Sequence, residues 1–487
     1  MMTHDRDSAS GYFYHGTAYL HMMRRHCKYG CPMCRPAFQG MKRERAMRTG
    51  KKDVKARYLI LVFGAFAVFF TGYPHIWSIY QPYAMELTGW SQGQASMCFY
   101  LYFVTFVLGN ITGGRIQDRY SPRMAVVIGG GIFTASVLLC SLALVPSPVM
   151  MYVFYGIFQG FGQGMIYTTI ISTAQKWFPG KTGFASGVIV TANGLFGFFM
   201  APFSRALLAG PGIKAAFLII GGMIGVSWVL AGIFIKNPEK AAEPEGTVPT
   251  AAGREMCAGR KKVGAPKQRA SKQYMPKQRV IKQYTSVEMI KTRRFYFLLS
   301  TMLFGLIPYL LLSPLSQTIQ TDRGISASAA VGAVMAGSVC NAVTRLILPT
   351  AADRVGRIIC LKAVLAVAAS SMVLLVVAPA SLTPVWVVLV YACYGGIMGS
   401  FPSLTSNIFG LDHSGENYGY VMLGIAAATL GAPAITNAVL GNGYDINVVF
   451  AAGAACAVVS FLFLLMLERE MKRDMEPETN PVIRLVN

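Results

Sequence analysis

Long apolar runs dominate the pattern of residues along the chain. Twelve stretches of roughly 20 residues carry almost no charge, and each is long enough to cross the ~30 Å hydrocarbon core of a bilayer as a helix. The runs cover residues 58–80, 95–115, 124–145, 149–172, 183–208, 212–235, 295–319, 327–350, 360–379, 384–408, 417–440 and 446–467. The sequence therefore predicts an all-α, multi-pass membrane protein with twelve transmembrane helices.

A long polar segment divides these runs into two sets of six. We therefore expect five regions in the chain. They are a basic amino-terminal tail (1–57), a first six-helix bundle (58–236), a basic linker (237–294), a second six-helix bundle (295–467) and a carboxy-terminal tail (468–487).

Charge is scarce and unevenly placed. Charged residues make up 13% of the chain, against roughly 25% in a soluble domain. Residues 1–57 carry 13 Lys/Arg against 4 Asp/Glu, and residues 236–294 carry 15 against 5, within a net charge of +23. Such runs can bind nucleic acid. Because both flank apolar spans, we attribute them instead to the Lys/Arg excess that marks cytoplasmic segments, where they lie near membrane lipid.

The short loops show the same asymmetry. Lys and Arg are absent from the loops at 145–149, 209–212, 378–384 and 441–445, and frequent in those at 113–123, 175–183 and 352–362. By the positive-inside rule, the second group, the linker and both termini are predicted to be cytoplasmic, in an inner or plasma membrane. The polar first 57 residues contain no apolar run typical of a cleavable signal peptide.

One polar motif occurs at matching places in the two halves. GRIQDRYSPR (114–123) follows the second run, and PTAADRVGR (349–357) follows the eighth. An acid and an arginine on a tight turn can pair, cap helix ends and latch neighbouring helices. Two copies indicate a repeated six-helix unit, whose halves can rock about a site between them. The expected latch residues are Gly114, Asp118, Arg119, Asp353, Arg354 and Arg357.

These motifs resemble the Gly-x-x-x-Asp-Arg-x-Gly-Arg loop of the major facilitator superfamily, and the resemblance covers about residues 55–470. The first copy departs from it at Ser121 and Pro122, and the second has Pro349 in place of the leading glycine. The resemblance implies the major facilitator fold, with two pseudo-symmetric bundles.

Four further stretches are similar to the oxalate/formate antiporter family, whose relatives include the monocarboxylate transporters. They are GYPHIWSIY (72–80), GFGQGMIYTT (160–169), NAVTRLILPTAADRVGR (341–357) and YGGIMGSFPSLTSNIFG (394–410). The resemblance implies a monomeric secondary transporter of small carboxylates, with a proton as a possible coupling ion.

Arg345 is the main candidate for substrate binding. It lies eight residues before Asp353, or about 12 Å along a helix, which places it near the middle of a ~30 Å core. An arginine there costs about 2.5–3.5 kcal/mol, so it should face protein or water rather than lipid. Its planar fork matches a carboxylate, and Asn341 shares its helical face. The resemblance implies the same role, because the family's corresponding arginine binds the carboxylate substrate.

Four other residues in the family-like stretches are candidates for the same site: His75, Trp77, Tyr167 and Tyr394. His75 is the one histidine within a predicted span, and it can titrate near physiological pH or bind substrate. For each of the four, ordinary packing between helices is the alternative interpretation.

Two departures from the family refine the expected substrate. The family's oxalate transporter has a lysine at the position that falls at about Ile425 here, and a site with one cation favours a monocarboxylate. The animal monocarboxylate transporters have an acid at the position of Asn341, so a proton-coupling carboxylate is missing from that place.

The amino-terminal tail contains a cysteine motif. Cys27, Cys31 and Cys34 have the C-x-x-x-C-x-x-C spacing of an iron–sulfur motif, and neighbouring histidines suggest zinc as an alternative. Because no supporting domain surrounds them, we expect no metal or cofactor.

The sequence contains no Gly-x-x-x-x-Gly-Lys-Ser/Thr motif, so a gradient rather than ATP should drive transport. We therefore expect a transporter of formate, lactate or pyruvate, or an oxalate/formate-type exchanger, that works by alternating access. A proton-coupled monocarboxylate symporter and a non-transporting membrane sensor are the alternatives. An enzyme is not expected, because no cluster of His, Asp and Glu converges in the spans.

Overall fold

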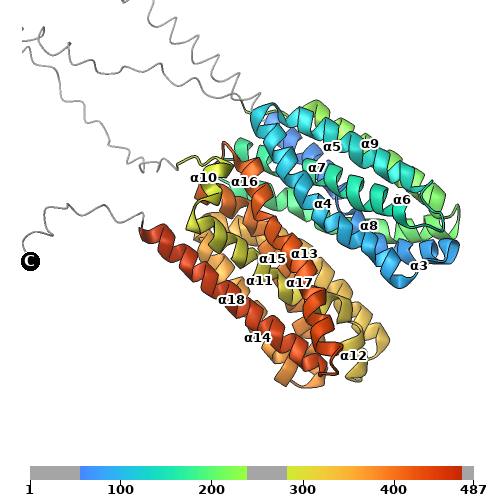
Figure 1. Cartoon of the computed structure of the whole chain (residues 1–487). Coiled ribbons are helices and arrows are strands. Elements are labelled where there is room, and N and C mark those ends of the chain that lie inside the picture. The colour runs from blue at the N-terminus through green and yellow to red at the C-terminus, as the bar shows by residue number, and fades with distance from the viewer. Residues whose placement is uncertain (1–54, 239–281, 474–487) are drawn as a thin grey trace, which may run out of the picture. The chain divides into compact units, whose positions relative to one another are not determined.

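The computed structural model describes residues 55–238 and 282–473, and every regular element in these ranges is a helix. Ten helices are long and apolar enough to cross a membrane (Figure 1). Two further crossing segments are interrupted. The first consists of a helix over 55–70, the 3-10 helix η1 (Tyr73–Ile76) and α3 (Trp77–Thr88). The second consists of α6 (Val149–Met151), the π-helix η2 (Tyr152–Gln159) and α7 (Gly160–Trp177). The prediction of a twelve-helix membrane fold is confirmed.

The remaining helices of the first half are α4 (Gln92–Arg119), α5 (Pro122–Cys140), α8 (Thr182–Ala209) and α9 (Ile213–Phe234). The second half contains α10 (Ser286–Ile290), α11 (Arg293–Leu315), α12 (Thr318–Asp322), α13 (Ala327–Val355), α14 (Arg357–Val377), η4 (Ala380–Leu382), α15 (Thr383–Phe409), α16 (Ser414–Val421), α17 (Leu423–Leu440) and α18 (Ile446–Arg473). The short helix α10 lies within the segment expected to be linker.

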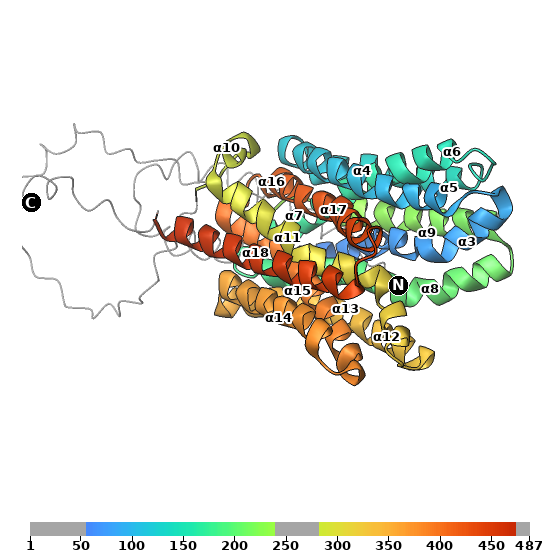
Figure 2. The ribbon, with the colours of Figure 1, turned by 60° about the horizontal axis from the view of Figure 1, so that its bottom comes forward.

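The helices from residue 59 onward belong to one compact unit, which contains both halves. In Figures 1 and 2 the blue-to-green helices of the first half and the yellow-to-red helices of the second half form separate groups. Helices α8 and α13 make the most extensive contact between the groups. We call the end of the unit that carries the Asp118 and Asp353 turns the basic end.

Local sequence determines where these helices begin and end. Ser91 and Gln94 form a capping box at the start of α4, which satisfies two backbone N–H groups reciprocally. Gly356 has a φ of 115°, which a side chain would disfavour, and it turns α13 directly into α14. The turn after Asp353 is therefore as tight as the motif predicts.

Glycines bring one pair of helices in each half into backbone contact. A Cβ atom at Gly164 of α7 would lie 2.1 Å from the carbonyl oxygen of Phe106 in α4. In the second half, a Cβ at Gly395 of α15 would lie 2.0 Å from the carbonyl oxygen of Asn341 in α13. Such approach is possible only without side chains. The pair α13–α15 thus repeats the pair α4–α7, which agrees with an internal duplication.

The Asp118 turn contacts the opposite half. Its carboxylate accepts a hydrogen bond from the backbone N–H of Glu416 (3.0 Å), at the start of α16. It also forms an ion pair with Lys176 (2.8 Å). Arg115, one turn earlier, forms an ion pair with the Glu416 side chain (2.8 Å). The side chain of Arg119 is exposed. Asp118 therefore caps a helix of the other half, and its cation partner is Lys176.

The Asp353 turn repeats this arrangement in the opposite direction. Its carboxylate accepts hydrogen bonds from the backbone N–H groups of Gly183 (3.1 Å) and Phe184 (3.0 Å), at the start of α8. Arg357 forms an ion pair with it (2.7 Å), whereas Arg354 is exposed. A carboxylate at a helix N-terminus is favoured by the unpaired N–H groups and the helix dipole.

The departure at Pro349 has a structural explanation. A Cβ at Gly114 would lie 2.3 Å from the backbone of Gly415, so this contact requires glycine on α4. At the matching contact, a Cβ at Gly183 would lie 2.0 Å from the carbonyl oxygen of Pro349. The glycine needed for close approach is therefore supplied by α8, and α13 can carry a proline.

The three tail cysteines, Cys27, Cys31 and Cys34, lie outside the described residues, as do residues 239–281 and 474–487. The structure therefore leaves the expectation for the cysteine motif as a prediction.

Candidate substrate site

A cavity of about 30 Å³ lies between the two halves, around the middle of the crossing helices. This volume holds about one water molecule. Both halves line it: the first with Thr71, Tyr102, Phe103, Phe106, Tyr167 and Asn193, the second with Arg345, Tyr394, Met398, Met422 and Ile425.

Arg345 is the one charged residue of this lining. Its side chain extends from α13 toward α8 and is only 4% exposed. Nε donates to the Oδ1 atom of Asn341 (2.9 Å), and Nη1 donates to the Oδ1 atom of Asn193 (3.0 Å). Nη1 also donates to the carbonyl oxygen of Val190 (3.4 Å). The guanidinium is thus held in place by neutral oxygens from both halves.

No ion pair between described residues includes Arg345, and the cavity lining contains no acidic side chain. Neutral amides orient a guanidinium but do not cancel its charge. In a low-dielectric interior an uncompensated charge is costly, and an anion that enters relieves this cost. The geometry therefore favours an anionic ligand.

Asn193 connects Arg345 to the interrupted first crossing segment. Its amide nitrogen donates to the hydroxyl of Thr71 (3.0 Å), which in turn donates to the carbonyl oxygen of Val68 (2.6 Å). Thr71 lies between the helix over 55–70 and η1, where the regular helix is broken. Irregular backbone at membrane depth is tolerated where it lines a cavity. Asn193 and Thr71 are not predicted from the sequence; for Asn193, an amide in an apolar run is the available signal.

Two of the predicted aromatic residues, Tyr167 and Tyr394, line the cavity. The guanidinium carbon of Arg345 lies 5.7 Å from the centre of the Tyr394 ring, within range of a cation–π contact. Tyr309 stacks on the Tyr394 ring, with centroids 3.9 Å apart, and fixes the position of Tyr394. Tyr102, which sequence reasoning did not single out, is a third lining tyrosine.

The two candidates from the first crossing segment are placed differently. Trp77 is buried outside the lining: its indole N–H donates to the carbonyl oxygen of Ala95 (3.1 Å), and its ring lies 4.3 Å from that of Tyr155. It holds α3 against α4. His75 falls in η1, and its side chain lies outside the described residues. The structure therefore brings together Arg345, Asn341, Tyr167 and Tyr394, without Trp77.

The rest of the cavity lining is apolar. Ile425 lines the cavity together with Met398, Met422 and Phe103. At Ile425 the lining thus has an apolar side chain and no second cation, as the sequence predicts. The site therefore offers one fixed positive charge and an apolar wall.

Hydrogen bonds between the halves are concentrated on one side of this cavity. In the described part of the chain they extend from the level of Thr191, which donates to the carbonyl oxygen of Ala342 (3.3 Å), to the basic end. One of them joins Ser406 of α15 to Gln175 of α7 (2.5 Å). The two halves are therefore held together by hydrogen bonds between the level of the cavity and the basic end.

Comparison with known proteins agrees with this architecture. Residues 59–433 match the model of the Major Facilitator Superfamily. The oxalate:formate antiporter of Oxalobacter formigenes is 24% identical over 409 residues, which cover 83% of this chain and 90% of that protein. Monocarboxylate transporter 2 of Meriones unguiculatus is 30% identical over 115 residues, or 23% of each chain.

The crystal structure of FucP, a Major Facilitator Superfamily transporter in the outward conformation, has a TM-score of 0.61. It aligns over 85% of this chain and 99% of that one, at 11% identity, which shows a shared fold. The chain belongs to the Major Facilitator Superfamily. It is a multi-pass membrane transporter of that superfamily, not an enzyme, and it resembles the oxalate/formate antiporter family.

Proposed function

We propose that this protein is a secondary active transporter of small organic anions, in which Arg345 binds the carboxylate of the substrate. The observation that carries the proposal is a guanidinium that is 4% exposed, held by the amides of Asn341 and Asn193, and not paired with an acid among the described residues. A planar guanidinium can hold a carboxylate by two parallel hydrogen bonds.

The lining favours a monocarboxylate of the formate, lactate or pyruvate class. A dicarboxylate brings two charges into a cavity that offers one cation, so its second charge has no cationic partner in the lining. Desolvating an unpaired carboxylate is costly, so the singly charged anion binds better. The lining tyrosines supply hydroxyl donors of the kind that orient a small polar ligand. The oxalate:formate antiporter of Oxalobacter formigenes is a relative, so exchange of oxalate for formate is tested together with monocarboxylate transport.

Transport by alternating access follows from two halves that meet around one site. The positive-inside rule favours a cytoplasmic location for the basic end. There, Asp118 and Asp353 would act as latches that hold the cytoplasmic side closed while substrate reaches Arg345 from the other side. Release of both latches would let the halves rock and expose the site to the cytoplasm.

The test is uptake of labelled formate, lactate, pyruvate and oxalate into proteoliposomes that contain the full chain. Counter-substrate inside the vesicles measures exchange, and a pH gradient measures proton-coupled symport. Transport of a monocarboxylate in either arrangement supports the proposal and tells the two modes apart. If no carboxylate moves in either one, the proposed substrate class is wrong.

The variant Arg345→Gln tests the site. It should abolish uptake, because glutamine keeps hydrogen-bonding capacity but loses the charge. Arg205 is an exposed arginine outside the cavity lining, so Arg205→Gln serves as the matched control and should transport normally. Normal uptake by Arg345→Gln would contradict the assignment of the site.

A further inference from the structure

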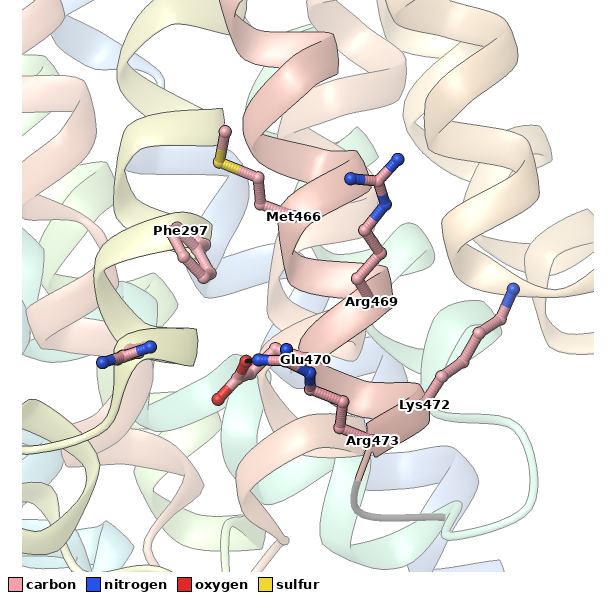
Figure 3. A pocket seen from close by; sticks show the side chains of 7 residues that line it. Phe297, Met466, Arg469, Glu470, Lys472 and Arg473 are labelled. Carbon is pink, nitrogen blue, oxygen red and sulfur yellow. Dashed lines mark ion pairs between the residues drawn. The ribbon is translucent and has the colours of Figure 1, made fainter. Parts of the chain in front are cut away.

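A second polar site lies at the basic end, far from the central cavity along the helices. It is a pocket of about 530 Å³ between the start of α11 and the end of α18, which we call the α11/α18 pocket (Figure 3). Its lining residues are Arg293, Phe297, Met466, Arg469, Glu470, Lys472 and Arg473.

Positive charge predominates in this pocket. Four of the lining residues are basic and one is acidic. Glu470 forms an ion pair with Arg473 (3.8 Å), as Figure 3 shows. Lys472 forms an ion pair with Glu468, which lies outside the pocket lining (3.0 Å). No ion pair between described residues includes Arg293 or Arg469. Two arginines, one from each helix, thus lie in the pocket without an acidic partner among the described residues.

The depth of the pocket matches the phosphate plane of a bilayer. The apolar part of α18 runs from residue 446 to residue 467, about 33 Å at 1.5 Å per residue, which fills the hydrocarbon core. Arg469 follows directly, and α11 begins with Arg293 before its own apolar run. Both arginines therefore lie just beyond the hydrocarbon core.

Apolar side chains continue from the pocket toward the lipid. Met466 is 46% exposed, and Leu462, one turn deeper on α18, is 49% exposed. Phe297 lines the pocket on the α11 side. The two helices are joined at the same level, because Arg294 donates to the carbonyl oxygen of Glu470 (3.4 Å). The pocket therefore has a charged mouth at headgroup depth and an apolar side at acyl-chain depth.

We propose that the α11/α18 pocket binds the headgroup of an anionic phospholipid. The phosphate lies against the basic side chains of the pocket, among which Arg293 and Arg469 have no acidic partner in the described part of the chain, and guanidinium forks suit phosphate oxygens. The acyl chains lie along Met466 and Leu462. A soluble phosphate could use the same arginines, but it would leave the apolar side uncovered, so the continuity of charge and apolar surface favours the lipid.

The experiment is native mass spectrometry of the full chain in detergent, titrated with phosphatidylglycerol, phosphatidylcholine or inorganic phosphate. Phosphatidylglycerol should bind at lower concentration than phosphatidylcholine, and inorganic phosphate should not displace it at equal concentration. Each basic residue near a membrane surface contributes roughly a fivefold factor to binding. The double variant R293Q/R469Q should therefore bind phosphatidylglycerol about 25-fold more weakly.

The matched control is R205Q/K214Q, which removes two exposed basic residues outside the pocket. Its affinity for phosphatidylglycerol should equal that of the unsubstituted protein. The charge-preserving variant R293K/R469K should keep this affinity to within a few fold. Unchanged binding by R293Q/R469Q would overturn the proposal, as would an equal loss in the control. Displacement by inorganic phosphate at equal concentration would also overturn it, since the ligand would then be a free phosphate.

Discussion

A negative charge placed beside Arg345 gives the sharpest test of how the central site works. Asn193→Asp changes one atom of a side chain whose Oδ1 already accepts from Nη1 at 3.0 Å. The substitution keeps size and shape but loses the amide donor to the Thr71 hydroxyl (3.0 Å), a loss that the Asn193→Ala variant shares. It converts a neutral acceptor into a negatively charged one. The aspartate then pairs with the Arg345 guanidinium in place of the substrate carboxylate.

The cost to substrate binding can be estimated from the separation between the charges. Two unit charges about 4 Å apart interact by about 4 kcal/mol at an effective dielectric constant of about 20. The new aspartate neutralises the guanidinium and repels an incoming carboxylate by an amount of this order. An effect of about 4 kcal/mol corresponds to about a thousandfold loss of affinity.

The assay is the half-saturation concentration of the transported carboxylate in proteoliposomes. Asn193→Ala removes the hydrogen bond without adding charge, and it should weaken binding by no more than about tenfold. Asn442→Asp adds the same charge at an exposed position outside the cavity lining and should leave uptake unchanged. An Asn193→Asp variant with the original half-saturation concentration would show that substrate does not use the charge of Arg345.

Three further predictions concern selectivity, packing and closure. Ile425→Lys puts a second cation in the lining, so oxalate should become a competitor of monocarboxylate uptake at about tenfold lower concentration; unchanged competition would argue against the one-cation account. Gly399→Ala places a Cβ 2.5 Å from the carbonyl oxygen of Arg345 and should destabilise the protein by roughly 1–3 kcal/mol in thermal unfolding. The control Gly197→Ala, with open space around its Cβ, should not; equal stability of both variants would refute the contact. Asp353→Asn removes the ion pair with Arg357 and weakens the cap on α8. Spin labels placed on the two halves at the basic end should then show longer distances between the halves. An unchanged distribution of these distances would rule out a latch.

The fold was largely predictable because its signals are local. A run of about 20 apolar residues can satisfy its backbone in lipid only as a helix, so the crossing segments could be read from composition alone. The two interruptions were not predicted. Neither the π-helix η2 nor the break before η1 has a signal in hydropathy, since both replace one internal hydrogen-bond pattern with another inside an apolar run.

The candidate site was only partly predictable. Arg345 was identifiable because a charge in an apolar run is expensive and needs a reason. Asn341 followed from helical spacing, as the hydrogen bond of 2.9 Å shows. Asn193 and Thr71 lie more than 150 residues away in sequence from Arg345, and no periodicity connects them to it. Trp77 also lies in a stretch that resembles the family, and yet it packs on Tyr155 outside the cavity lining.

The sequence by itself determined the membrane fold, the duplication and the one deep charge, because hydrophobicity, repeated motifs and the cost of a buried arginine are properties of short segments. The partners of that charge were decided by the tertiary structure alone. Whether Arg345 meets an acid or two neutral amides depends on which faces of α8 and α13 are brought together. Gly187 and Gly194 of α8, whose Cβ atoms would lie 3.1–3.4 Å from Arg345, allow this approach. The guanidinium therefore lies without an acidic partner among the described residues, at the interface of two halves that are far apart in the chain.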